Sequence, residues 1–373
     1  MKKYFRKIIL LLIVCLVVPC FSGCNEKNTT ESDGMRVAMI STPIDISDQS
    51  YNAIVYSTAK EFCEKNNLPF TYYRTQEEAT DSYLSVIDAA INDGYNVIVL
   101  NNYLAARAIR LATEANPDVK FIAVDVEQDN FGKNYKMPEN LTCCVFEEGY
   151  AGYMAGYAAV KEGYRHLGFM GGIATTAVLR YAYGFVQGAD AAAKELNADV
   201  KIEYVYANQF YGDADITAYM NSWYQSKGVD VVFACAGRAW TSVATAATEG
   251  NGKVIGVDTD QRGIINEYAG KDIAITAAMK GLDTAVRSAL ETIYDGRWSE
   301  IGGQSFKRGL VDKENLDNNY VRLPTDNWVM KNFTVNDYKK LVRDLYDKKL
   351  TFSDNISEPP KTSITVNYSG SIK

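Results

Sequence analysis

The stretch VIGVDTDQ, residues 254–261, decides the fold. Its first four residues are mostly apolar and rich in β-branched side chains, and they lead directly into a carboxylate. This is the pattern of a strand that is buried on both faces and leaves a parallel sheet at its carboxyl end. Residues 119–124 lead into Asp125 in the same way, and residues 231–236 lead into Gly237. Because ligands of open α/β sheets bind outside the carboxyl ends of the strands, the sequence predicts a cleft for a small polar molecule.

Strand and helix patterns alternate along the chain from residue 35 onward. Leu84, Ile87 and Ile91, for example, recur at the spacing that places them on one face of a helix. Strands are expected at residues 35–40, 70–73, 97–100, 119–124, 166–170, 200–206, 231–236 and 273–279, and helices at residues 105–115, 149–162, 176–196, 213–226 and 282–294. Successive βα units predict an α/β fold with doubly wound parallel sheets.

A second run of βα units starts near residue 146, which predicts two lobes with a hinge and an interlobe ligand cleft. The N-terminal lobe is expected to comprise residues 35–145 and 280–303, and the C-terminal lobe residues 146–279 and 304–352. Residues 353–373 form a polar tail rich in Ser and Pro, for which the sequence suggests no role.

Residues 1–23 have the features of a bacterial secretory signal rather than of a membrane span. A positively charged start precedes the apolar run 8–18, whose eleven residues are too few to span a bilayer comfortably. The segment ends in FSGC, which resembles a lipobox and predicts that Cys24 is lipidated; ordinary cleavage near Gly23, leaving Cys24 free, is the alternative. Residues 24–34 are polar and predict a flexible tether. We therefore expect a protein on the extracytoplasmic face of the cell membrane, attached through its lipid alone.

Composition and charge exclude several classes of function. The formal net charge is −7 and no cluster of Lys and Arg follows the signal, which argues against a nucleic-acid partner. The cysteines are in no metal or redox spacing, and the chain has 1 histidine, His166. We therefore expect no metal site, no cofactor and no catalytic residue.

Several short motifs occur together in one order. They are DQSYN (48–52), FIAVD (121–125), GYAGYMAG (149–156), GFMGG (168–172) and GVDTDQ (256–261), accompanied by Arg180, Phe210, Gly237 and Lys280. In this order and spacing they resemble the basic membrane protein family, lipoproteins similar to purine nucleoside receptor A that serve ABC importers. The resemblance covers roughly residues 36–300.

The resemblance implies a type I periplasmic-binding-protein fold with two α/β lobes, three crossovers and a purine nucleoside in the cleft. It also implies a monomer that docks on the permease of an ABC transporter. Asp48 and Asn52 match positions that the family uses toward the base, and Tyr51 and Phe210 match aromatics that sandwich the purine. A purine has two large π faces, so one ring from each lobe can stack on it.

The resemblance also implies polar contacts to the ribose and to the edge of the base, at positions matched by Asp125, Asp258 and Lys280. A cis-diol has two hydroxyl donors, which a carboxylate can accept together. Burying two carboxylates in a closing cleft is unfavourable without compensation, and Lys280 is the nearest candidate cation.

Gly237 matches a close approach of the backbone to the ligand. The motif GRAW that it begins departs from the glycine-rich sequence usual in the family at this point. Trp240 ends this motif and is expected to line the cleft. Because Arg238 and Trp240 replace the usual glycines, the identity of the ligand stays open. Arg180 is expected to pair with a carboxylate for structural reasons and has no expected ligand role.

Each site residue also has a structural interpretation. Asp48 can equally be a helix cap, Tyr51 and Phe210 can be core aromatics, and Lys280 taken alone is typical of a surface lysine. The leading hypothesis is a lipid-anchored solute-binding protein that captures a purine nucleoside of the guanosine, inosine or adenosine type. The alternatives are a receptor for a sugar or another small polar solute with the same fold, and a nucleoside-processing enzyme, against which no nucleophile–base arrangement is visible.

Overall fold

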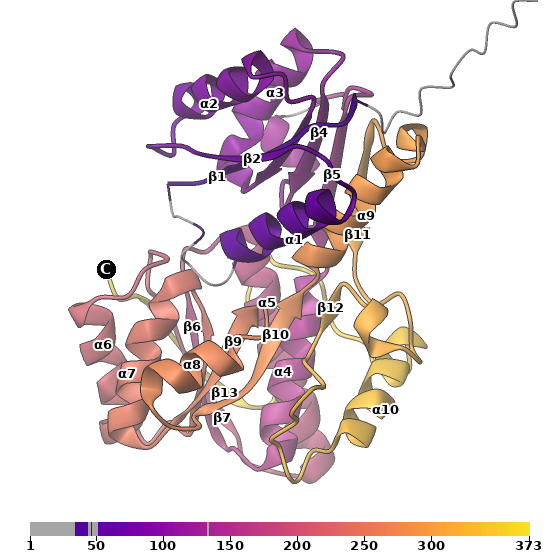
Figure 1. The fold of residues 1–373 in the computed structure, drawn as a ribbon. Helices are drawn as coiled ribbons and strands as arrows, with labels where there is room; N and C mark the ends of the chain where they lie inside the picture. The colour runs from indigo at the N-terminus through magenta and orange to yellow at the C-terminus, as the bar shows by residue number, and fades with distance from the viewer. Residues whose placement is uncertain (1–33, 44–45, 47–50, 133) are drawn as a thin grey trace, which may run out of the picture.

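The protein is described by a computed structural model that covers residues 34–43, 46, 51–132 and 134–373. The expected signal peptide, Cys24 and Asp48 lie outside these residues. Within them, the strands form two sheets, each covered by helices on both faces (Figure 1). No helix of the described segments is both long enough and apolar enough to cross a membrane.

The first sheet has the strand order β11-β5-β4-β3-β1-β2, and every pairing in it is parallel. Its strands are β1 (Val37–Ser41), β2 (Phe70–Arg74), β3 (Val97–Asn101), β4 (Lys120–Val124), β5 (Leu141–Phe146) and β11 (Gln304–Arg308). Helices α1 (Tyr51–Lys65) and α9 (Leu282–Tyr294) pack together on one face, and α2 (Thr80–Asn92) and α3 (Ala106–Ala115) on the other. Every residue of β1 and β3 is buried, which explains their uninterrupted apolar sequences.

The second sheet has the order β12-β10-β9-β8-β6-β7-β13. Its strands are β6 (His166–Gly171), β7 (Lys201–Tyr206), β8 (Val231–Cys235), β9 (Lys253–Asp258), β10 (Ala274–Lys280), β12 (Val321–Arg322) and β13 (Thr365–Ser371), of which β12 is antiparallel to β10. One face carries α4 (Glu148–Glu162) and α5 (Thr176–Leu196), with α10 (Val335–Tyr346) against α4; α6 (Ala214–Asn221), α7 (Trp240–Gly250) and α8 (Arg262–Ala269) lie on the other face.

Glycines allow α4 and α5 to touch backbone to backbone. A Cβ atom on Gly152 or Gly156 of α4 would lie 2.1 Å from a carbonyl oxygen of α5. On α5, a Cβ on Gly184 or Gly188 would meet a carbonyl oxygen of α4 at 2.1 and 2.0 Å. The glycine-rich motif GYAGYMAG therefore serves helix packing, and side chains at these positions would force the two helices apart.

The structure changes two expectations for the end of the chain. Strand β11 pairs with β5 over Thr142–Phe146, so residues 304–308 belong to the first sheet and the expected limit at residue 304 was wrong. The chain passes between the sheets after β5, after β10 and after β11. Residues 365–371, in the tail to which no role was assigned, form an edge strand beside β7. Both strands are largely exposed and lack an apolar run, so no local pattern marks them.

Candidate functional site

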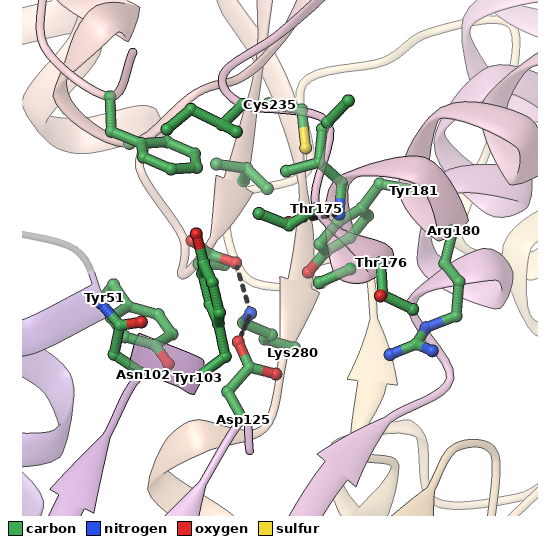
Figure 2. Close-up of a pocket in the computed structure, with 18 of the residues that line it drawn as sticks. Tyr51, Asn102, Tyr103, Asp125, Thr175, Thr176, Arg180, Tyr181, Cys235 and Lys280 are labelled. Atoms are coloured by element: carbon green, nitrogen blue, oxygen red, sulfur yellow. Dashed lines mark hydrogen bonds and ion pairs between the residues drawn. The ribbon is translucent and has the colours of Figure 1, made fainter. Parts of the chain in front are cut away.

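A cavity of about 460 Å³ lies between the two sheets, at the carboxyl ends of several strands (Figure 2). Its volume is in the range of small-molecule sites. Residues from the first lobe line one side, and α5 with the loops after β7 and β8 lines the other. The predicted residues that line it are Tyr51, Asn52, Asp125, Phe210, Gly237, Asp258 and Lys280.

A buried charge cluster forms the polar floor of the cavity. Lys280 ends β10, and its Nζ lies 2.5 Å from Asp125 Oδ2 and 3.4 Å from Asp258 Oδ1. The lysine side chain is 4% exposed and both aspartate side chains are 13% exposed. Burial lowers the pKa of Lys280, but Asp125 and Asp258 outweigh it and raise the pKa above its usual value, so the ammonium stays charged. A carboxylate offers two acceptor oxygens with about four lone-pair sites, so a pair of carboxylates that shares one cation is chemically suited to accept hydrogen bonds from hydroxyl groups.

The two aspartates take their positions from an unusual backbone conformation. Asp125 follows β4 with φ 63°, and Asp258 ends β9 with φ 65°. Asp and Asn adopt this left-handed region more readily than other residues with a side chain. Each strand therefore turns at its aspartate, and the two carboxylates converge on the same ammonium from different lobes.

An aromatic side chain comes from each lobe. Tyr51 begins α1, and its ring centre lies 4.9 Å from Lys280 Nζ, within the distance of a cation–π contact. Burial, followed by the charges of Asp125 and Asp258, raises the pKa of Tyr51, so its hydroxyl remains a hydrogen-bond donor. Phe210 comes from the loop after β7, in the second lobe.

Two glycines make room for the Phe210 ring. A Cβ on Gly172 would lie 2.4 Å from a Phe210 ring carbon, and a Cβ on Gly237 would lie 3.2 Å from the Phe210 carbonyl oxygen. Gly237 also has φ 50°, where a side chain is unfavourable. Gly237 was expected to let the backbone approach the ligand closely. In the structure the residue that lies close to Gly237 is Phe210.

Substituting Gly172 should displace the Phe210 ring. We expect Gly172→Ala to weaken binding of an aromatic ligand by about tenfold, because a stacked ring contributes about 1–3 kcal/mol and the new methyl overlaps its resting place. Gly263→Ala is the control, since no atom lies within 4 Å of a Cβ at that position. Isothermal titration calorimetry on both variants measures the difference; equal affinities would show that the Phe210 position does not matter.

Trp240 does not line the cavity, so this prediction was wrong. It is the first residue of α7, is 5% exposed, and packs edge to face on Tyr268 with ring centres 5.3 Å apart. Strand β8 ends at the cavity, but the turn Gly237–Ala239 follows it. After this turn the Trp240 side chain enters the core between the second sheet and helices α6–α8. Arg238 is exposed and does line the cavity.

Asn52 is held by a neighbouring amide. It is buried on α1, and its Oδ1 accepts a hydrogen bond of 2.9 Å from Asn101 Nδ2 at the end of β3. This contact orients the Asn52 amide at the cavity wall. Asp48, the other residue expected toward the base, lies outside the described residues.

The sequence reasoning missed several residues of the wall. Asn102 and Tyr103 follow β3 and lie on the same side of the cavity as Tyr51 in Figure 2. Asn102 has φ 103°, and its side chain accepts from Leu104 N at 3.0 Å. The rule that selected Asp125, a polar residue directly after a buried strand, applies equally to Asn102. Tyr181 of α5 carries a buried hydroxyl without a hydrogen-bond partner among the described residues, as expected for a group that a ligand satisfies.

Arg180 lines the cavity and joins the two lobes there (Figure 2). Its Nη2 lies 2.6 Å from Glu127 Oε1, after β4, and its Nε lies 2.6 Å from Glu148 Oε2, at the start of α4. Glu148 is fully buried; its burial raises the pKa of its carboxyl, although Arg180 acts in the opposite direction. The structural pairing expected for Arg180 is therefore observed, and it links a loop of the first sheet to both central helices of the second.

Two α/β lobes with a charged and aromatic cavity between them are the architecture of periplasmic-binding-protein-like folds. A solute-binding protein of an ABC transporter system from Conexibacter woesei has a similar structure, with a TM-score of 0.65 and 20% identity over 86% of this chain and 99% of that one. A family model for PnrA-like substrate-binding proteins of ABC transporters matches residues 35–355. The chain belongs to this family, the Bmp family.

Named relatives agree with this assignment. The ABC transporter nucleoside-binding protein BmpA of Lactococcus lactis is 27% identical over 350 residues, which cover 88% of this chain and 93% of the relative. Basic membrane protein B of Borreliella burgdorferi is 30% identical over 315 residues, covering 82% and 86% of the two chains. The predicted family and fold class are confirmed. The chain is a solute-binding protein rather than an enzyme, and it works with a solute and a transporter.

Proposed function

We propose that this protein captures a purine nucleoside and delivers it to the permease of an ABC importer. The observation that carries the proposal is the arrangement of one cavity in which Tyr51 and Phe210, from opposite lobes, lie with the cluster of Lys280 and two aspartates. The Lactococcus lactis relative, described as nucleoside-binding, supports the same ligand class.

Each part of a nucleoside finds a chemical counterpart in the cavity. The two faces of the purine suit the two aromatic rings, and each stack contributes about 1–3 kcal/mol. The ribose hydroxyls are donors, which suit the carboxylates of Asp125 and Asp258. A micromolar dissociation constant requires about 8 kcal/mol, which two stacks and a few charge-assisted hydrogen bonds can supply after the costs of association.

The proposal is tested by calorimetric titration with inosine, guanosine and adenosine, compared with free bases, ribose and 2′-deoxyinosine. A ribonucleoside should bind most tightly, and the deoxy analogue more weakly because it leaves a buried carboxylate without its donor. Tight binding of a sugar without response to any nucleoside would favour a sugar receptor. Recovery of free hypoxanthine after incubation with inosine would favour an enzyme.

Asp258→Asn should weaken inosine binding at least about tenfold, since a hydrogen bond to a charged group contributes about 1.5–3 kcal/mol. Asn tolerates the left-handed backbone at this position, so the fold should be kept. Asp272→Asn is the control. Asp272 is exposed and lies just before β10, whereas the cavity lies at the opposite, carboxyl end of this strand. Calorimetry decides: equal dissociation constants for both variants would remove Asp258 from the site.

The remaining part of the proposal concerns attachment to the membrane. We propose that lipid on Cys24 holds the mature protein as a monomer on the extracytoplasmic face, with residues 24–34 as the tether. Incorporation of a labelled fatty acid into the wild type but not into Cys24→Ser tests this attachment, and label in both would argue against it.

A further inference from the structure

The segment 365–373 lies beyond the part of the chain that the family model matches, residues 35–355, yet it is built into the second sheet. Strand β13 runs parallel to β7 from the pair Thr365–Lys201 to the pair Ser371–Tyr206. Ile372 N then donates to Tyr206 O at 2.8 Å. The segment therefore follows β7 to its carboxyl end, where the loop that carries Phe210 begins.

One largely buried acid anchors this segment, and another anchors the residues just before it. Asp190 of α5 accepts hydrogen bonds from Ser363 N at 2.7 Å and Ser363 Oγ at 2.6 Å. Glu203 of β7 accepts from Asn367 Nδ2 at 2.9 Å. Asp190 and Glu203 are 6% and 4% exposed, so Ser363 and Asn367 satisfy acids that would otherwise lie buried with fewer partners.

The end of the segment reaches the Phe210 loop directly. Lys373 Nζ lies 2.5 Å from Asp213 Oδ2, and Gln209 Nε2 donates to the same oxygen at 2.6 Å. Asp213 Oδ1 caps α6 by accepting from Ile216 N at 3.0 Å. The Ile216 amide, followed by Lys373, lowers the pKa of Asp213 to about 2. Gln209 and Asp213, which stand on either side of Phe210 in the chain, are therefore bonded to each other, and Lys373 pairs with the oxygen that joins them.

We propose that residues 365–373 position the aromatic wall of the ligand site, and that Lys373 is a positioning residue for Phe210. The segment orders the loop 207–212 before the ligand arrives, so less conformational freedom is lost on binding. This inference rests on the proposed function only in that the ligand stacks on Phe210.

The experiment compares Lys373→Met and a chain ending at residue 364 with Lys313→Met. Lys313 is the matched control: it pairs with Asp347 at 2.8 Å, and the two side chains are 42% and 30% exposed against 38% and 25% for Lys373 and Asp213, but Asp347 follows α10, which packs on α4. The first readout is hydrogen–deuterium exchange of peptides covering residues 207–212 without ligand. The second is the dissociation constant for inosine.

Lys373→Met should speed exchange in residues 207–212 severalfold and weaken inosine binding about two- to fivefold, as fits a partly exposed ion pair. The shortened chain should show a larger loss, about tenfold, because the strand beside β7 is also gone. In a Phe210→Ala background, Lys373→Met should no longer change the dissociation constant.

The proposal is overturned if residues 207–212 exchange as slowly in Lys373→Met as in Lys313→Met, or if the effect of Lys373→Met on affinity persists without Phe210. Should the wild type bind no nucleoside, faster exchange of residues 207–212 in Lys373→Met would still support the positioning role. That combination of results would refute a nucleoside as the ligand but not the positioning role of Lys373.

Discussion

Lys280→Met should lower the affinity for inosine by roughly a hundredfold or more. The substitution leaves Asp125 and Asp258 buried without their shared cation, and breaking a buried ion pair from one side costs about 3–5 kcal/mol. Each 1.4 kcal/mol corresponds to about tenfold in affinity. Calorimetry gives the dissociation constant, and urea denaturation gives the accompanying loss in the free energy of unfolding.

Two further variants separate binding from folding. Adding Asp125→Asn to Lys280→Met removes one unneutralised charge, so it should recover part of the unfolding free energy but not the affinity. Lys253→Met is the control, since Lys253 begins β9 at the opposite end of the sheet and its Nζ bonds to an exposed carbonyl, Asp272 O, at 2.7 Å. Unchanged inosine binding in Lys280→Met would refute the role of the cluster.

Arg180→Met should lower the free energy of unfolding by about 3–5 kcal/mol at pH 8, because the fully buried Glu148 loses its ion-pair partner. The loss should be smaller at pH 5. Burial raises the pKa of Glu148 in the folded protein, so the folded state binds a proton more readily than the unfolded chain and stability falls as pH rises. Arg180 opposes this rise in the pKa of Glu148, so its removal should make stability fall more steeply as pH rises. Urea denaturation at the two pH values measures it.

Arg297→Met provides the comparison for Arg180. Arg297 also pairs with two acids, Asp295 at 3.0 Å and Glu300 at 2.7 Å, but its side chain is 46% exposed. Its removal should leave the denaturation midpoint nearly unchanged at both pH values. If Arg180→Met were equally destabilising at pH 5 and pH 8, the buried carboxylate of Glu148 would not be the cause.

Features fixed by local pattern were predictable from the sequence. The apolar runs located the central strands, and the expected helices 176–196 and 282–294 coincide with α5 and α9. Polar residues at strand ends identified Asp125 and Asp258, because each lies at the carboxyl end of a parallel strand and the cavity lies between the carboxyl edges of the two sheets.

Features fixed by distant contacts were not predictable in this way. The exposed strands β11 and β13 are defined only by their pairing with β5 and β7. Lys280 was located through the family resemblance alone, since its burial depends on an acid 155 residues away. Trp240 was misplaced because nearness to a strand end does not determine which face of the following helix a side chain occupies.

The left-handed backbone at Asp125 and Asp258 limits how a cavity of this design can change its cargo. Only Asp, Asn and Gly suit such positions well, so the floor can lose charge but cannot accept bulky or β-branched replacements without strain. Tyr103 and Arg238, which line the walls, carry no such restriction. A lineage built on this scaffold would therefore diversify its cargo by exchanging wall residues over an inherited acidic floor.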